Sequence, residues 1–299
     1  MPQWPESPES LPAGHPVATV PTARPGRTGR LRLLFTVKDG RTVLTDGYAE
    51  PPFAIGRVFY PAGPALAHLI LVQTTAGLFG GDVLSATIDV EPGARVVLTS
   101  QAAQKVHPSA EGEWARQQWH ARVAAGGELH GYLEPIIPFA GARLDQRTRF
   151  EVARGAHLFW ADGLMAGRVR REERWQFVAL RTETALVRDE QLAFLDRASI
   201  GEDHAAADKP WAMDSYVYLG TQIACGVPGA RDKGEALQAS LFDGERADDV
   251  RGAVDAVEDD VLVGRALMSD GVSFGRLQRA WRRAVFEDLL GEPEPPLRP

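Results

Sequence analysis

The sequence predicts a mainly β protein with about a dozen strands or more and two α-helices in its C-terminal half. Two observations support this prediction. Short runs in which apolar and polar residues alternate are separated by glycine, proline and aspartate turns. Apolar residues at helical spacing occur only from about Gly234 onward. Predicted strands therefore do not alternate with helices, which disfavours a doubly wound α/β fold.

The composition sets the domain organisation. The chain has 299 residues, of which 44% are apolar and 24% charged, as in an ordinary soluble globular protein. Residues 1–28 are proline-rich and lack apolar periodicity, so we expect a disordered leader there. Residues 29–290 are expected to form one β-rich domain without internal repeats, and the proline-rich residues 291–299 a flexible tail.

Charge, cysteine content and hydropathy exclude several classes of function. The net charge of −7 gives no electrostatic support for general nucleic-acid binding. Cys225 is the only cysteine, which excludes an internal disulfide and a cysteine-based metal site within one chain. No apolar run approaches the roughly 18 residues of a membrane span, and the N-terminal residues lack a secretory pattern. We therefore expect no membrane association and a cytoplasmic location.

The first predicted strands form a hairpin and then flank a glycine-rich turn. Residues 31–37 and 41–48 are apolar runs joined by Lys-Asp-Gly, a good hairpin turn. Residues 66–72 and 84–90 flank a turn in which three glycines fall within five positions, as expected for a tight turn or a close backbone approach. Asp82 ends this turn. Its carboxylate can accept hydrogen bonds from nearby backbone N–H groups, which we favour, or point outward as a ligand.

Residues 143–152 show the clearest alternation. One face is apolar or polar-uncharged and the other is charged, so the charged face must be solvated and we expect an open antiparallel sheet face. Further strands are predicted at residues 95–100, 128–133, 157–162, 174–181, 185–189, 216–224 and 261–268.

The C-terminal helix is the stronger of the two predicted helices. Its apolar face contains Phe274, Leu277, Trp281, Ala284, Val285 and Leu289. Gly291 is its predicted C-terminal cap. A weaker helix is predicted somewhere within residues 234–254.

The residues alone do not define a catalytic site. The glycine cluster is not a phosphate loop, and no H-E-x-x-H or Gly-x-Ser-x-Gly motif is present. The histidines are scattered, although His120 and His130 could approach each other on neighbouring strands. Carboxylates, including Glu134 and Asp162, could form a glycosidase pair, and tryptophans could line a carbohydrate groove, but no spacing singles out a pair. Packing is the favoured role of the tryptophans.

Several short motifs follow one another along residues 26–290. They are Gly-Arg before the first strand, Gly-Leu-x-Gly-Gly-Asp (Gly77, Gly80, Gly81, Asp82), Thr-Ser-Gln-x-Ala-x-Lys (Thr99, Gln101, Lys105), Phe-x-Gly-Ala-Arg (Gly141, Arg143) and Gly-Arg with a later Glu-x-Trp (Gly167, Arg168, Glu173). In number, order and spacing these motifs resemble the urease accessory protein UreD family, called UreH in some organisms.

The resemblance implies a urease maturation factor rather than an enzyme. Members of that family form a complex with UreF and the GTPase UreG, and the complex docks on apo-urease so that nickel enters its active site. The resemblance further implies an elongated, coiled all-β assembly with two helices and an internal passage for nickel. It implies no tightly bound cofactor, only nickel(II) in transit, which needs weak, exchangeable oxygen or imidazole contacts.

On this resemblance four carboxylates are candidates to line the passage: Asp82, Glu173, Glu134 and Asp162. The alternative roles are structural, with Asp82 capping its turn and Glu173 pairing with Arg168 or Arg170. Two other functions remain open. One is a β-rich carbohydrate-active enzyme that uses paired carboxylates, and the other is an interaction module without metal transit.

Overall fold

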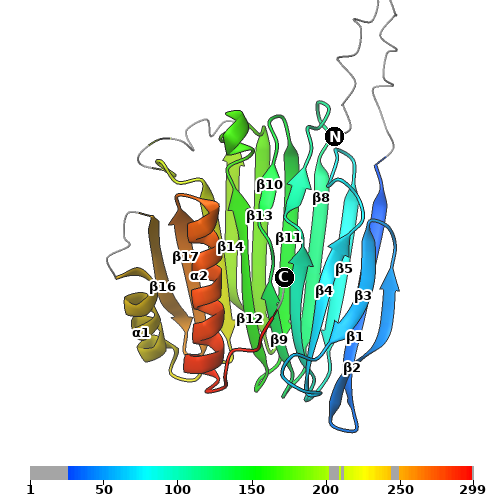
Figure 1. Cartoon of the computed structure of the whole chain (residues 1–299), viewed down its shortest axis with the longest axis vertical. Helices are drawn as coiled ribbons and strands as arrows, with labels where there is room; N and C mark the ends of the chain where they lie inside the picture. Colours follow the sequence, from blue (N-terminus) through cyan, green and yellow to red (C-terminus); the bar gives the residue numbers. More distant parts are fainter. Residues whose placement is uncertain (1–25, 202–208, 210–211, 244–248, 298–299) are drawn as a thin grey trace, which may run out of the picture.

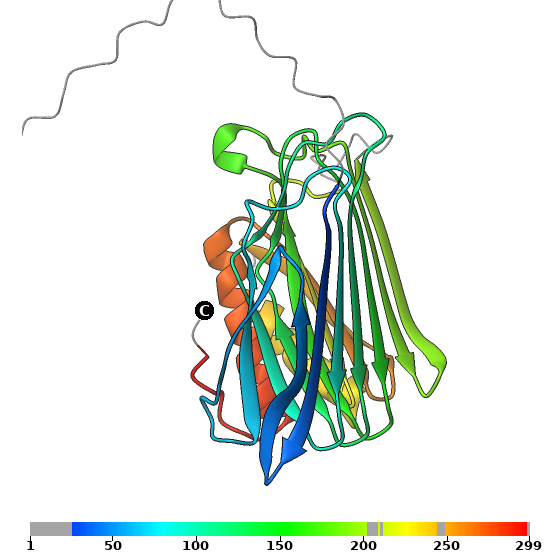
Figure 2. The same ribbon diagram turned by 90° about the vertical axis from the view of Figure 1, so that its right-hand side faces the viewer.

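The computed structural model describes residues 26–201, 209, 212–243 and 249–297, so most of the predicted leader lies outside the described residues. Two β-sheets face each other, and both helices lie on the outer side of one of them (Figure 1, Figure 2). The mainly β fold with two helices in the C-terminal half is therefore confirmed. None of the helices in these ranges is long and apolar enough to cross a membrane.

The strand order defines the two sheets. The seven-stranded sheet runs β14 (Gln191–Gly201), β13 (Ala179–Arg188), β11 (Arg143–Val152), β8 (Ala115–Val123), β5 (Val83–Val90), β1 (Thr28–Lys38) and β2 (Arg41–Ala49). The ten-stranded sheet runs β16 (Val250–Glu258), β17 (Val261–Met268), β15 (Tyr218–Cys225), β12 (His157–Met165), β9 (Glu128–Tyr132), β6 (Arg95–Gln101), β4 (Leu66–Gln73) and β3 (Phe53–Phe59). The short strands β7 (Gln104–Val106) and β10 (Ile136–Pro138) pair beside it.

The middle of the chain winds as a coil between the sheets. From β4 to β13 the long strands alternate between the ten-stranded and the seven-stranded sheet, and each pairs in parallel with the corresponding strand of the next coil. This arrangement confirms the coiled assembly that the sequence resemblance implies. It also shows why strands follow one another without intervening helices, because each connection crosses to the opposite sheet.

Three turns of the coil have the same geometry. Each follows a buried valine and is closed by a backbone hydrogen bond of 2.8–3.1 Å, from Ala94 to Glu91, from Gly127 to Ala124 and from Ala156 to Ala153. The third residue of each turn is a glycine with φ of 73–75°, a conformation that favours glycine. A short Val-x-x-Gly repeat thus marks the coils, and the expectation that the domain lacks internal repeats is wrong.

The main core fills the space between the two sheets. Inward side chains of both sheets are almost fully buried, among them Leu33, Phe35, Leu84, Ile88, Leu129, Leu144, Phe150 and Leu158. A second apolar layer lies between the ten-stranded sheet and the helices α1 (Ala230–Phe242) and α2 (Gly271–Ala284). The helical spacing of the predicted C-terminal helix is confirmed, since Phe274, Leu277 and Trp281 are buried on one face.

Several sequence-based boundaries are corrected by the structure. Strand β11 has its charged face in solvent as predicted, but it is an internal strand with parallel neighbours on both sides, not part of an antiparallel face. The strands predicted at 174–181 and 185–189 are one strand, β13, preceded by a loop. The weaker helix begins earlier and ends at Phe242, and β16 occupies the later part of its predicted range. The hairpin turn and the cap at Gly291, with φ of 69°, are as predicted.

Gly131 lies in β9 of the ten-stranded sheet, against the core residue Trp160. A Cβ atom at this position would lie 2.1 Å from Cε3 of Trp160. We expect Gly131→Ala to lower the free energy of unfolding by about 3 kcal/mol, the upper range for overpacking, because Trp160 must move. Urea denaturation measures this loss. The matched control is Gly56→Ala in β3, where the nearest atom is 4.0 Å from the added Cβ. Equal midpoints for the two variants would contradict the prediction.

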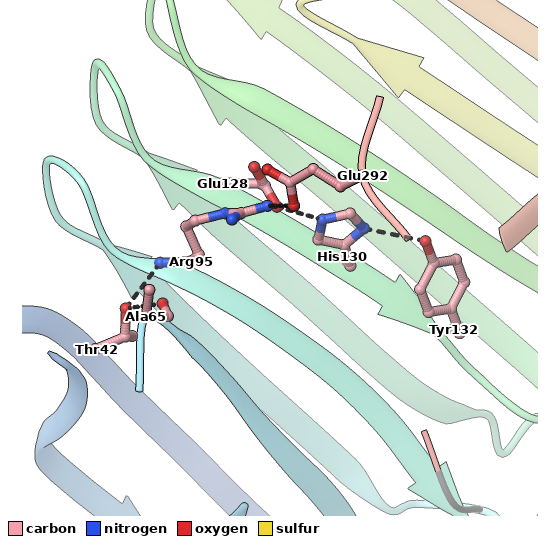
Figure 3. A network of polar contacts seen from close by, with 7 residues as sticks. All are labelled: Thr42, Ala65, Arg95, Glu128, His130, Tyr132 and Glu292. Carbon is pink, nitrogen blue, oxygen red and sulfur yellow. Dashed lines mark hydrogen bonds and ion pairs between the residues drawn. The ribbon is translucent and has the colours of Figure 1, made fainter. Parts of the chain in front are cut away.

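A partly buried polar network ties the C-terminal segment to the ten-stranded sheet (Figure 3). Arg95 Nη2 donates to Glu128 Oε1 at 2.9 Å and to Glu292 Oε2 at 2.7 Å. His130 is fully buried, with one ring nitrogen 2.7 Å from Glu128 Oε1 and the other 3.0 Å from the Tyr132 hydroxyl. The predicted approach of His120 to His130 is wrong, because His120 lies on β8 in the other sheet.

Candidate functional site

Four of the sequence motifs gather at the end of the sandwich opposite the three short turns. The glycine turn (residues 77–82), residues 101–107, residues 138–143 and residues 167–175 all connect the ten-stranded to the seven-stranded sheet (Figure 1). Backbone hydrogen bonds join the first three: Leu78 donates to Lys105 at 2.9 Å, and Phe139 donates to Val106 at 2.9 Å. Motifs far apart in the sequence therefore form one continuous surface.

Asp82 is part of the architecture of the glycine turn. Its side chain is 6% exposed, and its carboxylate accepts from the backbone N–H of Phe79 at 2.9 Å and of Arg27 at 2.8 Å. The first contact closes the turn and the second holds the start of β1. The glycines are needed for space as well as conformation, since a Cβ on Gly77 would lie 2.4 Å from the carbonyl oxygen of Lys105. Gly81 has φ of 84°.

Glu173 is held by Arg168 in a forked ion pair. Arg168 Nε lies 2.6 Å from Glu173 Oε2, and Arg168 Nη2 bonds the other carboxylate oxygen. The backbone N–H of Ala140 adds a contact of 3.2 Å, and the guanidinium lies 4.1 Å above the Phe139 ring. Arg168 lowers the pKa of Glu173 through its hydrogen bond and its charge. These contacts account for Glu173 as a positioning group that joins two loops.

The remaining motif residues have mixed placements. Arg143 donates to the carbonyl oxygen of Ala110 at 3.2 Å, and Thr99 Oγ1 lies 2.9 Å from His68 Nε2. Gly141 and Gly167 have positive φ values of 80° and 110°. Lys105 is exposed. Gln101 is exposed and lines the mouth of a small cavity.

Two small, partly open cavities lie between the sheets, and each has a volume of about 50 Å³. A volume of this size holds a few water molecules. The first is lined by Gln101, Gln104, Gln117, Trp119, Glu134 and others, and the second by Leu180, Thr182, Thr184, Asp196, Thr221 and others. Both are lined by Ile136, Gln146, Asp162 and Gly163, so the two cavities adjoin at these residues.

Asp162 is the charged group at this junction. Its Oδ2 accepts a hydrogen bond from Trp160 Nε1 at 3.2 Å. Enclosure by the protein raises the pKa of Asp162 to about 6, against the smaller lowering effect of the Trp160 bond; nearby Asp196 raises it further. The accessible part of its surface lines the cavities. The carboxylate therefore titrates close to neutral pH in a narrow, mainly apolar space.

Unpaired amide atoms line the same space. The side-chain oxygen of Gln146 and the side-chain nitrogen of Gln104 are buried and have no hydrogen-bond partner in the protein. Buried polar atoms are nearly always satisfied, so these two are available to water or to a passing ion. Gln146 lines both cavities, next to Asp162.

The structure thus brings together two of the four candidate carboxylates. Glu134 lines the first cavity, is exposed, and has its pKa raised by partial burial. Asp162 lies deeper, at the junction. Asp82 and Glu173 line neither cavity and serve the loops instead. Across the described ranges, no group of three or more His, Cys, Asp or Glu side chains is arranged to hold a metal ion.

Sequence reasoning missed the neutral polar residues of the cavities. Gln117, Gln146 and Thr182 occupy inward positions of β8, β11 and β13, where the alternation calls for apolar side chains. That mismatch was the available signal, because a buried amide needs a partner.

Comparison with known proteins gives a consistent result. The family model described as UreD urease accessory protein matches residues 27–299. The chain is similar to the urease accessory protein UreD of Deinococcus radiodurans, with 35% identity over 69% of this chain and 74% of that protein. It is 33% identical to the UreD of an Anaeromyxobacter species over 90% of this chain and 92% of that protein. It is 29% identical to UreD 2 of Streptomyces griseus over 94% of this chain and 96% of that protein.

Proposed function

Because this chain belongs to the UreD family of urease accessory proteins, we propose that it binds UreF and UreG, docks on apo-urease and lets nickel(II) pass through its interior. Membership of the family supports a role in urease maturation. The binding of UreF, UreG and apo-urease and the route of nickel through the interior are our proposal.

The observation that carries the proposal is the junction of the two cavities at Asp162. Together they form a mainly apolar space with a few polar groups, which crosses several coils between the sheets. Carboxylate and amide oxygens bind nickel weakly enough to release it, whereas a closed set of thiolates would hold it. Asp162 supplies a charge and Gln146 an unpaired oxygen, so an ion that keeps part of its water shell is stabilised there and can leave.

The cavities at Asp162 give no support to the carbohydrate-active alternative. A cavity of about 50 Å³ is far below the roughly 300 Å³ at which ligand pockets begin. Trp119 and Trp160 are buried and contact each other edge to face, with ring centroids 6.2 Å apart. These tryptophans pack the core and do not present faces to a sugar.

The first test omits the chain from an otherwise complete system. Urease subunits, UreF and UreG of the same organism are co-expressed with and without it, and both complex formation and nickel-dependent urease activity are measured. We expect the chain to copurify with UreF and active urease to form only in its presence. Full activity without the chain, or no association with UreF, would overturn the proposal. A chain that assembles and activates equally when Asp162 is replaced would instead favour a pure interaction module.

A further inference from the structure

One row of inward side chains in the ten-stranded sheet is polar, although the rows on both sides of it are apolar. In this polar row the strand register places Asp162 of β12, Thr221 of β15 and Arg265 of β17 side by side. The two neighbouring rows consist of Trp160, Ile223 and Val263 and of Leu164, Leu219 and Leu267. Polar groups therefore lead in one line from the junction of the two cavities towards the side of the sandwich.

Arg265 ends the polar row in an ion pair that joins the two sheets. Its Nη2 contacts Oδ2 of Asp196 on β14, the edge strand of the seven-stranded sheet. Asp196 lines the second cavity, as does Thr221, the neighbour of Arg265 in the row. The side chain of Arg265 is 41% exposed and that of Asp196 is 20% exposed. The ion pair therefore lies between solvent and the cavity that Asp162 lines.

The charges at this cavity do not balance. Burial is the main cause that raises the pKa of Asp162; the charge of Asp196 raises it further, and that of Arg265 lowers it. The two carboxylates thus repel each other, and the single charge of Arg265 can neutralise only one of them. A divalent cation in place of the guanidinium would neutralise both. A partly exposed ion pair also contributes little to stability, so stability is a weak reason to keep it.

Uncharged oxygen atoms are available at the same cavity. Gln146 is only 9% exposed, and its side-chain oxygen is buried without a hydrogen-bond partner. Because buried acceptors are nearly always satisfied, this oxygen indicates a missing donor or cation. The hydroxyl-bearing residues Thr182, Thr184 and Thr221 line the cavity beside it. Carboxylate, amide and hydroxyl oxygens are the ligands that divalent cations of the harder kind accept.

We propose that Arg265 is the gate of a divalent-cation site at the second cavity. In the closed state its guanidinium neutralises Asp196. When the side chain turns out to solvent, Asp196 and Asp162 bind one cation, with the unpaired oxygen of Gln146 beside them. The exposure of Arg265 lets it turn without the movement of a strand, so an ion can enter or leave between β14 and β17.

The gate extends the proposed function, since it gives the internal passage an opening at the side of the sandwich. That the ion is nickel(II) rests on the proposed function. The requirement for a divalent cation and for oxygen ligands rests on the charges and side chains of the cavity alone. The closing experiment therefore uses metal binding by this chain and does not depend on the other urease proteins.

The test measures the affinity of the purified full chain for nickel(II) alone by equilibrium dialysis, with magnesium(II) titrated in parallel. The wild-type chain is compared with Arg265→Gln, with Arg265→Met, and with each of these combined with Asp196→Asn. Met keeps the apolar stem of the arginine side chain, so it is a second uncharged variant if Gln disturbs the fold. Arg279→Gln, on the exposed face of α2, is the matched control. Thermal unfolding of each variant verifies the fold.

We expect both single variants at Arg265 to bind nickel(II) at least tenfold more tightly than the wild-type chain, because the competing charge is gone and both carboxylates remain. The double variants should lose this gain, and the control should stay within twofold of the wild type. Equal affinity of the wild-type chain and the folded Arg265 variants overturns the gate. A gain that persists without Asp196 also overturns it, because the ion then binds elsewhere. A gain for magnesium(II) and none for nickel(II) supports the gate and counts against the proposed function.

Discussion

Asp162→Asn is expected to reduce nickel-dependent urease activation by about tenfold or more while leaving the accessory complex assembled. The amide keeps the shape of the side chain and can still accept the Trp160 hydrogen bond. The substitution removes only the negative charge at the junction of the two cavities. Activation in the co-expression system and copurification with UreF are the two measurements.

The same substitution is expected to stabilise the protein. The pKa of Asp162 is about 6 in the folded chain against 3.8 for an exposed aspartate, so the folded state favours the protonated acid. The free energy of unfolding therefore falls as pH rises from 3.8 to 6, and at pH 7 the ionised group costs about 3 kcal/mol. Asp162→Asn removes that cost. A variant that is more stable and less active would show that the charge is retained for function.

The pH dependence of activation supplies a further check on Asp162. At pH 5 roughly a tenth of the Asp162 side chains remain ionised, so wild-type activation should fall relative to pH 7 by more than that of the Asn variant. Glu91→Gln in an exposed turn is the control and should change neither activation nor stability. Unchanged activation by Asp162→Asn would remove Asp162 from the route.

Glu128→Gln is expected to destabilise the protein by about 3 kcal/mol at pH 7. Glu128 is 6% exposed and lies between Arg95 and His130. Burial alone would raise its pKa, but hydrogen bonds and charges from His130 and Arg95 outweigh burial and lower it from 4.5 to about 2. The stabilisation is fully present above pH 4.5 and is lost as pH falls towards 2. Glu128 and Asp162 thus have opposite effects on stability at neutral pH.

Urea denaturation of the wild-type chain and Glu128→Gln at several pH values between 7 and 3 measures this contribution. The difference between them should shrink as pH falls below 4.5, because protonation removes the same interactions in the wild-type chain. Glu91→Gln again serves as the control. A difference below about 0.5 kcal/mol at pH 7 would mean that Glu128 is not held as a charged group.

Local patterns in the sequence predict what is local in the fold. The alternation of residues 143–152 correctly identifies the buried face of β11, because side-chain direction depends only on the strand itself. It does not identify the neighbours of β11, since two strands from adjacent coils pair with it in parallel. The Val-x-x-Gly repeat was visible but too short to be recognised without its stacked geometry.

In the candidate site, too, the sequence predicts local features but not the contacts that depend on the fold. The resemblance made Asp162 one of four candidate carboxylates, with no reason to prefer it to Asp82 or Glu173. Only the packing of the two sheets separates a residue that lines a cavity from two that hold loops. The alternation of residues 128–132 places Glu128, His130 and Tyr132 on one face. From the sequence alone, this pattern is typical of a polar face in contact with solvent. Instead that face is covered by α2 and by the segment that carries Glu292. Glu292 is held there by Arg95, 197 residues earlier in the sequence.

Because the fold is built from stacked coils, the distance that the cavities span can change only in steps of one coil. The cavities cross the coils rather than run along the strands, so each coil of about 30 residues adds one strand spacing, about 4.8 Å, to the distance they span. Duplication or loss of a whole coil would lengthen or shorten that distance while every remaining inward side chain kept its place. A single-residue insertion within a strand would instead turn the following side chains outward. Relatives of different length are therefore expected to differ by whole coils or at the turns.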